Sequence, residues 1–597
     1  MYELDKKVNN LRKELETLPK GNITYKNIRG AKRMYLDGKY VKAANEAEAV
    51  AKVNRRNKIR TELDDLLSGK ASSESGTLPS AEFLTNVICG EKLQSYVDGV
   101  KGFKQRECFG RLKSFLDSEV MGKVCLLYGL RRTGKTIMLF QAIATHDLEE
   151  SAYIKIMSSN DMSMLNSDLK LLSEQGIKYV FIDEITLMND FIDSASLLSD
   201  VYAMSGMKIV LAGTDSLGFV FSGDEELYDR TVTIHTTFIP FREYSALLGI
   251  HDIDEYIRYG GTFRVGETNF EDPEFEDEGI SFRDDESTRR YIDTAIARNI
   301  QHSLACYKDG AHFRHLIGLY EADEFTNAVN RIIEDMNHRF LLSVISRDFK
   351  SHDLGSATQI DRKRAAAKGR TSIMDQADKQ GVIGRFMKIL NIKNSDDLSV
   401  EITADHISEI KEYLKLLDLI IDCPVETIGS SPSENVLFSQ PGMRYCQAQA
   451  LVYSIMKDET FDSFSIVEKN QFCNIILEDV KGRMLEEIVL LETKKTLPRE
   501  KRAFKLIFAV GEFDMVIADE KNLTCEIFEI KHTENISKGQ YKNLIDEEKC
   551  RMTEHKFGTI IRKTVLYRGK DTVVDGIHYA NVTSYLEHLS PGASKHK

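Results

Sequence analysis

Short apolar runs separated by longer amphipathic segments dominate the chain between about residues 120 and 220. The four runs lie at 124–128, 152–156, 178–184 and 208–216, and the last two end in polar residues. A continuous apolar run of this length is typical of a strand that is buried on both faces of a parallel sheet. Alternation of such strands with helical segments predicts a doubly wound α/β fold, in which ligands bind at the carboxyl ends of the strands.

A second, alternating pattern lies in the last quarter of the chain. Residues 511–517 and 526–531 predict two strands joined by a polar turn at 519–522. Side chains two residues apart on a strand share a face, so Glu529 and Lys531 should point together while Phe528 and Ile530 face a core. Asp514 can meet the charged pair from the neighbouring strand.

The first 70 residues form a basic arm. Apolar steps of three and four residues predict a helix at 5–18, and a second helix is expected at 45–67. Between them, 23–25, 33–36 and 39–41 predict short strands with a hairpin turn at Asp37-Gly38. The arm holds 17 Lys and Arg against 10 Asp and Glu, a local +7 that leaves −20 for the rest of a chain with net charge −13. Binding of a nucleic acid backbone and a solvated face on a docking arm are equally good interpretations.

The middle of the chain alternates between acidic, helical and mixed patterns. Residues 267–286 carry ten acidic side chains and predict a solvated insertion, and 325–349 predict a helix. Residues 407–417 form an amphipathic pattern with one apolar face. The apolar segments 419–424 and 435–438 that follow could form the wing of a winged helix.

Length and composition indicate several globular domains. The chain has 597 residues, 42% hydrophobic and 29% charged. We expect a multidomain α/β protein with five segments: a small α+β arm of helix, β-hairpin and helix at 1–70, the α/β core at 71–250, a helical region with the acidic insertion at 251–380, a winged-helix-like segment at 381–457, and a C-terminal α/β domain at 458–597.

Neither a membrane span nor a disulfide framework is predicted. No apolar stretch approaches the roughly 18 residues that a membrane helix needs, and the first residues do not resemble a signal peptide. We therefore expect a cytoplasmic protein without a membrane partner. The nine cysteines are scattered without a C-x-x-C pair, which favours reduced thiols over disulfides or structural zinc.

A phosphate-binding loop follows the first apolar run. The sequence Gly129-Leu130-Arg131-Arg132-Thr133-Gly134-Lys135-Thr136 matches G-x-x-x-x-G-K-[ST] in full. Glycines let backbone N–H groups approach phosphate oxygens at the start of a helix. Lys135 should reach the β- and γ-phosphates, and Thr136 should offer its hydroxyl to Mg²⁺. The alternative is a glycine-rich turn that binds nothing, but the strand before it and the helix after it favour a nucleotide.

Acidic and polar residues end two of the later strands. Asp183 and Glu184 close the third apolar run in a Walker B pattern, where Asp183 would hold Mg²⁺ and Glu184 would polarise the attacking water. Thr214 or Asp215, after the fourth run, could sense the γ-phosphate.

These motifs together resemble archaeal-type ATPases of the STAND and AAA+ group. Those proteins carry a Gly-x-Arg-Arg-x-Gly-Lys-Thr loop, which places Arg131, Arg132 and Thr133 among the residues that hold the nucleotide. The resemblance continues at 239–243, where Ile-Pro-Phe-Arg-Glu lacks the serine of the family's segment, and at 259–262, which resembles a Gly-Gly turn. It implies ATP as the nucleotide and a winged helix after the ATPase core.

The C-terminal pattern resembles the PD-(D/E)XK nuclease core. Asp514 and Glu529-Ile530-Lys531 match its signature, and Glu486 ends a Gly-x-x-x-Glu segment like that of nucleases fused to these ATPases. Asp514 and Glu529 would bind Mg²⁺ through carboxylate oxygens, and Lys531 would orient a water or stabilise the transition state. Glu486 would touch metal or water. The alternative is a half-exposed hairpin whose charges face solvent.

The sequence therefore predicts an ATP-hydrolysing protein that controls a Mg²⁺-dependent nuclease domain acting on nucleic acid, with DNA as the first expectation. Assembly into a homo-oligomer is left open. The alternative is a STAND-type signalling or assembly switch whose C-terminal domain only docks a partner.

Overall fold

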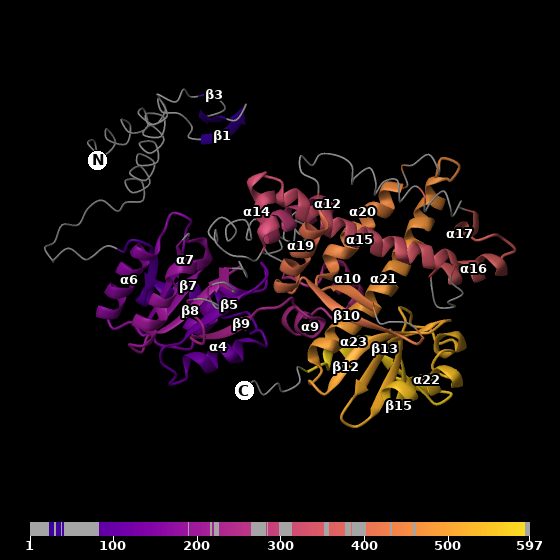
Figure 1. The fold of residues 1–597 in the computed structure, drawn as a ribbon. Coiled ribbons are helices and arrows are strands. Elements are labelled where there is room, and N and C mark those ends of the chain that lie inside the picture. Colours follow the sequence, from indigo (N-terminus) through magenta and orange to yellow (C-terminus); the bar gives the residue numbers. More distant parts are fainter. Residues whose placement is uncertain are drawn as a thin grey trace. The chain divides into compact units, whose positions relative to one another are not determined.

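The computed structural model describes most of the chain from residue 83 onward and three strands before it (Figure 1). The described residues are 23–28, 31–36 and 39–40, of which the backbone is described, and then 83–188, 190–214, 226–263, 284–297, 313–350, 357–376, 402–429, 433–455 and 461–590, with a few single positions between them. The chain divides into two units, Met1–Glu82 and Phe83–Lys597. The division falls later than the predicted boundary at residue 70.

The first unit contains a three-stranded antiparallel meander. Its strands are β1 (Ile23–Ile28), β2 (Ala31–Leu36) and β3 (Lys39–Tyr40). Leu36 pairs with Lys39, so β2 and β3 are adjacent strands, and the predicted turn at Asp37-Gly38 lies outside the described residues. The predicted helices at 5–18 and 45–67 lie outside the described residues.

A six-stranded sheet begins the second unit, in the order β4-β6-β7-β8-β5-β9. The strands are β4 (Asn86–Cys89), β5 (Val124–Tyr128), β6 (Ser151–Lys155), β7 (Tyr179–Asp183), β8 (Lys208–Gly213) and β9 (Thr231–His235). β4 is antiparallel to β6, and all the other pairs are parallel. The four predicted strands are confirmed, and β4 and β9 add the two edges.

Both faces of this sheet are buried. On β5, Val124 and Leu126 pack in one apolar core while Cys125 and Leu127 pack in another. The helices α3 (Gln94–Val100), α4 (Phe109–Leu116) and α5 (Lys135–Ile143) cover the second core, and α6 (Met162–Glu174) covers the first. Continuous apolar strands arise because each successive side chain meets a helix on its own side. The doubly wound fold that the sequence predicted is confirmed.

Helices make up most of the described chain between residues 241 and 496, before and between strands of the second sheet. They are α9 (Phe241–Leu248), α10 (Ile253–Tyr259), α12 (Asp285–Tyr291), α14 (Arg314–Glu321), α15 (Phe325–Lys350), α16 (Ala357–Ala367), α17 (Ile373–Gln376), α19 (Ala404–Leu416), α20 (Pro441–Ile455) and α21 (Ile466–Thr496). α15 and α19 confirm the two helices predicted in this region. Most of the acidic insertion lies outside the described residues. Within the described ranges, no helix is long and apolar enough to span a membrane.

The second sheet has eight strands in the order β11-β10-β12-β13-β14-β15-β17-β16. They are β10 (Ile420–Thr427), β11 (Ser433–Phe438), β12 (Lys501–Ile507), β13 (Glu512–Asp519), β14 (Thr524–Ile530), β15 (Thr559–Tyr567), β16 (Thr572–Val574) and β17 (Ile577–Asn581). The predicted hairpin is β13 and β14, which are antiparallel. Its turn is fixed by Asp519, whose side chain accepts hydrogen bonds from the backbone and side chain of Asn522 at 2.9 Å each.

The hairpin predicted as a wing belongs to this sheet. β10 and β11 are antiparallel, as expected, but β10 also pairs in parallel with β12 through Val425 and Lys505. The sequence placed these strands in a segment separate from the C-terminal domain, and here the structure differs. The local pattern indicates a hairpin. It does not indicate that β10 also pairs with β12, because that pairing joins residues some 80 positions apart.

α21 packs on one face of the second sheet. Met484, Leu485 and Ile488 share an apolar core with Met515 and Phe528 of the sheet. The other face carries α22 (Glu547–Phe557), and α23 (Val582–Glu587) follows the last strand pair. The core under α21 also includes the buried aromatic residues of α9 and α10, so these two helices and the second sheet form one packed region.

Candidate functional site

The loop between β5 and α5 has the backbone that a phosphate cradle needs. Gly129 and Gly134 have φ of 143° and 86°, and Arg132 has φ of 63°. A Cβ on Gly129 would lie 2.4 Å from the carbonyl oxygen of Thr236, so no larger residue fits without movement of the backbone. α5 begins at Lys135, which leaves the first N–H groups of that helix beside the loop.

We predict that Gly129→Ala weakens nucleotide binding by about tenfold or more, because the loop must leave its present path to accept a side chain. The measurement is the Kd of a fluorescent ATP analogue together with the Tm. Gly110→Ala is the matched control, because Gly110 lies in α4 with open space around a Cβ. Alanine there should leave the Kd unchanged and the Tm equal or slightly higher. Equal affinity in both variants would contradict the cradle.

Lys135 is folded back onto its own loop. Its Nζ donates to the carbonyl oxygens of Gly129 and Leu130, at 2.8 Å each. Burial lowers the pKa of Lys135 to about 8, against the attraction of Glu184 and Asp183. The positive charge of Lys135 is thus only partly balanced by the nearby acidic side chains. A bound anion could complete the balance.

Thr136 and Asp183 lie side by side, as their predicted roles require. Thr136 Oγ1 donates to Asp183 Oδ2 at 3.2 Å. The same carboxylate oxygen accepts from Tyr153 Oη at 2.9 Å and Lys155 Nζ at 3.0 Å. Tyr153 and Lys155 were missed by the sequence analysis. The register of parallel strands is the signal that could have found Lys155, because it pairs with Asp183 at the carboxyl ends of β6 and β7.

Glu184 and Thr214 also meet. Thr214 Oγ1 donates to Glu184 Oε2 at 2.9 Å, across the ends of β7 and β8. Glu184 has φ of 59°, a conformation that an unbranched acidic residue adopts at a cost of about 1 kcal/mol or more. The backbone therefore changes direction at Glu184, directly after the end of β7.

The other loop residues make contacts that hold the loop in place. Thr133 is buried, and its hydroxyl donates to the carbonyl oxygen of Leu130 at 2.8 Å. The carbonyl oxygen of Arg131 accepts from Tyr291 Oη at 3.2 Å. The carbonyl oxygen of Arg132 accepts from the N–H of Phe263 at 3.0 Å, in the segment after the predicted Gly-Gly turn. The side chain of Thr133 thus braces the loop from within.

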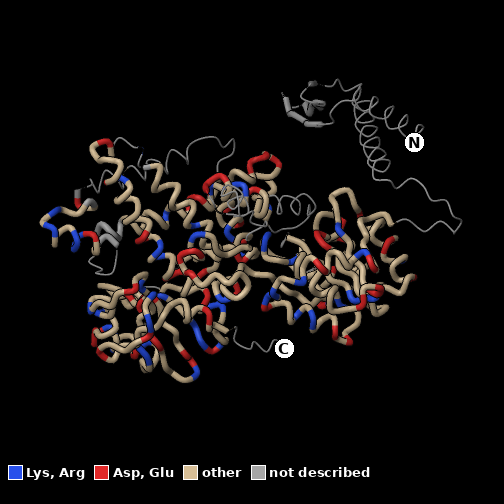
Figure 2. The backbone as a smooth tube through the Cα atoms, turned by 180° about the vertical axis from the view of Figure 1, so that it is seen from behind, with Lys and Arg blue, Asp and Glu red and all other residues tan. Residues whose placement is uncertain are grey.

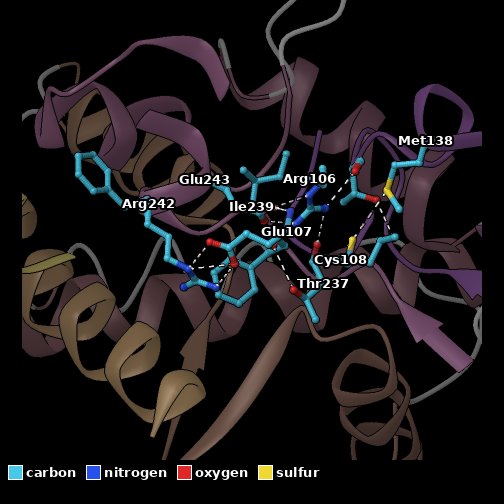
Figure 3. Close-up of polar contacts among 12 residues, drawn as sticks. Arg106, Glu107, Cys108, Met138, Thr237, Ile239, Arg242 and Glu243 are labelled. Carbon is cyan, nitrogen blue, oxygen red and sulfur yellow. Dashed lines mark hydrogen bonds and ion pairs between the residues drawn. The ribbon is translucent and has the colours of Figure 1, made fainter. Parts of the chain in front are cut away.

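A buried arginine that the sequence analysis missed supports the loop (Figure 3). Arg106 Nη1 donates to the carbonyl oxygen of Thr133 at 3.0 Å, and Nε and Nη2 donate to Glu243 at 3.2 and 2.5 Å. Both side chains are 5% exposed. Glu243 raises the pKa of Arg106 although burial opposes the charge. A buried pair of this kind is costly to break, about 3–5 kcal/mol for loss of one partner.

A second polar cluster lies between β13 and β14. Lys531 Nζ donates to Asp514 Oδ2 at 3.1 Å and to Glu529 Oε2 at 2.7 Å. Asp514 also accepts from the N–H of Ile530 at 2.8 Å, and Asn543 donates to Glu529 at 2.9 Å. Both carboxylates are buried. The two carboxylates that the sequence predicted to converge on Lys531 therefore both lie within hydrogen-bond distance of it.

The pKa values of these two carboxyl groups shift in opposite directions. Burial raises the pKa of Glu529, and the negative charge of Asp514 adds to this against the attraction of Lys531. Lys531 and Lys505 lower the pKa of Asp514 despite its burial. Two acids with unequal environments can differ in protonation at the same pH.

Glu486 belongs to the same cluster as Asp514. Glu486, Glu512 and Asp514 each place one carboxylate oxygen within 4.8 Å of the others, a spacing that a metal ion could bridge. Lys505 Nζ contacts Glu512 at 2.8 Å and Glu486 at 3.4 Å, and Arg483 also binds Glu486. Glu512 and Lys505 were missed by the sequence analysis. Glu512 lies two residues before Asp514, and this period could have indicated it.

Glu487, considered beside Glu486, points elsewhere. Its carboxylate binds Arg444 of α20, whose guanidinium lies over the rings of Phe340 and Phe438, at 4.3 and 4.5 Å from their centroids. Glu487 is therefore part of the packing between α20 and α21.

A further glutamate of α21 contacts the segment after β9. Glu492 Oε1 accepts from the N–H of Phe241 at 2.7 Å and from Tyr256 Oη at 3.1 Å. Its Oε2 is buried without a hydrogen-bond partner among the described residues. Burial raises the pKa of Glu492 to about 7.

We predict that Glu492→Gln weakens the pH dependence of stability. Glu492 binds its proton more tightly in the folded than in the unfolded protein, so its contribution is complete below about pH 4.5 and is lost as pH rises through about 7. The loss is about 3 kcal/mol at pH 8, and a glutamine, which keeps the acceptor oxygen, should avoid it. Thermal unfolding at pH 5.5 and 8.5 measures this. Glu478→Gln, at a side chain 45% exposed on the same helix, is the control. Parallel pH curves for all three proteins would contradict the prediction.

Comparison with known proteins finds similarity in the first of these regions. Residues 121–245 match a family model described as an AAA domain. A curated relative, an uncharacterized protein of Methanocaldococcus jannaschii, is 24% identical over 246 residues, which cover 36% of this chain and 52% of the relative. The chain thus spans about half the length of that relative.

A solved structure, Aeropyrum pernix ORC1 protein in complex with DNA, matches 58% of this chain and 91% of its own chain at 13% identity and a TM-score of 0.19. A TM-score this low does not establish a shared overall fold. The AAA match and the parallel sheet with its loop support an AAA-type, ATPase-like nucleotide-binding domain.

Proposed function

We propose that this chain binds and hydrolyses ATP at the loop between β5 and α5, and that this activity controls a Mg²⁺-dependent nuclease site between β13, β14 and α21. The observation that carries the proposal is the convergence of Asp514, Glu529 and Lys531 in the same chain as a complete phosphate-loop motif. The nucleic acid substrate is expected to be DNA.

The residues of the first site fit ATP and Mg²⁺. Gly129 leaves no room for a side chain where the loop turns, so its backbone can approach a phosphate closely. The buried ammonium of Lys135 supplies the positive charge, and Thr136 and Asp183 supply adjacent oxygen ligands. When bound, Mg²⁺ neutralises charge on the phosphates.

The position of each residue at the first site indicates its role in hydrolysis. Lys135 would exchange the carbonyl oxygens of Gly129 and Leu130 for phosphate oxygens. Glu184 would accept a proton from, or orient, the attacking water, while Thr214 holds its carboxylate in place. Arg106 would keep the loop in its present path through the carbonyl oxygen of Thr133.

The second site fits a divalent cation with oxygen ligands. Asp514, Glu486 and Glu512 offer three carboxylates within reach of one ion, and Glu529 shares Lys531 with Asp514. Lys531, held by Asp514 and Glu529, would orient a water or stabilise charge on the phosphodiester. Basic and acidic residues are interspersed along the described chain (Figure 2), so a nucleic acid would be recognised through local groups.

One observation favours the second candidate, a nucleotide-driven switch whose C-terminal domain only docks a partner. The four carboxylates of the cluster already contact three cations of the chain, Arg483, Lys505 and Lys531. A cluster neutralised in this way can be purely structural.

A single incubation series separates the two candidates. Purified protein is mixed with plasmid, and Mg²⁺ and ATP are each added or omitted. The nuclease proposal requires cleavage that depends on Mg²⁺ and changes with ATP. ATP turnover with intact plasmid under all conditions would favour the switch.

A further inference from the structure

α21 contributes one residue to the carboxylate cluster. It also contacts two series of hydrogen-bonded residues, each of which begins at the nucleotide loop. It is one continuous helix from Ile466 to Thr496. Glu486 belongs to the cluster, whereas Glu487 and Glu492 are bound from outside the second sheet. Along a helix that rises about 1.5 Å per residue, all three lie within about 10 Å.

The first series runs through α9. Arg106 joins the carbonyl oxygen of Thr133 in the loop to Glu243 in α9. Phe241, the first residue of the same helix, donates its N–H to Glu492 at 2.7 Å. Each of the polar side chains in this series is buried, so its hydrogen bonds have no competing water.

The second series runs through α20. Tyr291 Oη donates to the carbonyl oxygen of Arg131 in the loop, and Gln440 Nε2 donates to Tyr291 Oη at 3.0 Å. Gln440 directly precedes α20, and Arg444 one turn later binds Glu487. Gly261 packs closely here, since a Cβ on it would lie 2.8 Å from the Cα of Gln440.

Resting on the proposed function, we propose that α21 transmits the state of the nucleotide loop to the carboxylate cluster, through α9 at Glu492 and through α20 at Glu487. Both series begin with a hydrogen bond to a carbonyl oxygen of the loop itself. If the loop reorients around phosphates, these two hydrogen bonds must shift or break. Both end on one helix beside Glu486. A displacement of α21 changes the distance of Glu486 from Asp514 and Glu512, which lie on the sheet.

The Glu492 contact has room to change. Only one of its two carboxylate oxygens is hydrogen-bonded, and the other is buried without a partner in the described chain. A shift of α9 can therefore be followed by exchange of the two oxygens rather than by loss of the contact. The buried orphan oxygen marks a position where packing alone would favour an apolar side chain.

Hydrogen–deuterium exchange on the full chain tests the relay without any need for cleavage. Peptides covering the loop and α21 are compared with and without ADP or a nonhydrolysable ATP analogue. In the wild type, nucleotide should change exchange in α21 by about fivefold or more. Glu492→Met, which removes the acceptor but keeps the volume, should reduce that change to below about twofold while the nucleotide Kd stays within about threefold.

Two further variants complete the design. Glu487→Gln alters the α20 contact alone and should reduce the response in part, which keeps the test decisive if Glu492→Met does not fold. Glu478→Met, at an exposed position of the same helix, should keep the full response. A loop protected by nucleotide with α21 unchanged, or an undiminished response in Glu492→Met and Glu487→Gln, overturns the relay. A loop that nucleotide does not protect overturns the proposed function itself.

Discussion

Lys135→Ala should lower ATP hydrolysis by at least about a hundredfold, because a positive charge aimed at the developing charge of a phosphoryl transfer is lost. The structure adds an expectation for stability. The buried ammonium donates to two loop carbonyl oxygens, and burial lowers its pKa to about 8 against the attraction of Glu184 and Asp183. Removing it should therefore leave the Tm unchanged or slightly raised. Phosphate release and thermal unfolding measure the two effects.

Lys170→Ala is the matched control for this variant. Lys170 is an exposed lysine of α6 in the same domain, and its loss should leave hydrolysis within about twofold of the wild type. Normal hydrolysis in Lys135→Ala would remove the assignment of the loop. A large fall in Tm would instead indicate that Lys135 serves the fold.

The parts of the fold with local signals were predicted well. β5, β7 and β8 are continuous apolar runs because helices cover both faces of their sheet. The β13–β14 hairpin follows from alternation and a polar turn. In each case the decisive interactions are repeated along one short segment, and the sequence of that segment is sufficient.

The parts that depend on distant pairing were not predicted. Arg106 and Glu243 are 137 positions apart, and the local sequence around either residue does not indicate that the other is its partner. The same holds for Lys505, whose contact with Glu486 follows from the packing of α21 on β12. The edge position of β10 and β11 in the second sheet is a choice of neighbour, which a local pattern leaves open.

Asp514→Ala and Lys531→Ala should each reduce Mg²⁺-dependent cleavage of plasmid by at least about a hundredfold while ATP turnover stays within about twofold. Asp514 contacts Lys531 and lies within reach of the same ion as Glu486 and Glu512, so its loss removes a cation ligand and one of the carboxylates that hold Lys531. Loss of Lys531 leaves Glu529 and Asp514 buried without their shared cation, so Lys531→Ala should also lower the Tm.

Controls separate loss of chemistry from loss of fold. Lys521→Ala changes an exposed lysine in the turn of the same hairpin and should cleave like the wild type. Lys531→Met keeps the aliphatic stem, and equal loss of cleavage in both Lys531 variants at different Tm would assign the effect to the charge. Unchanged cleavage in Asp514→Ala or Lys531→Ala would remove the nuclease proposal, because the convergence of these side chains with Glu529 is the observation on which it rests.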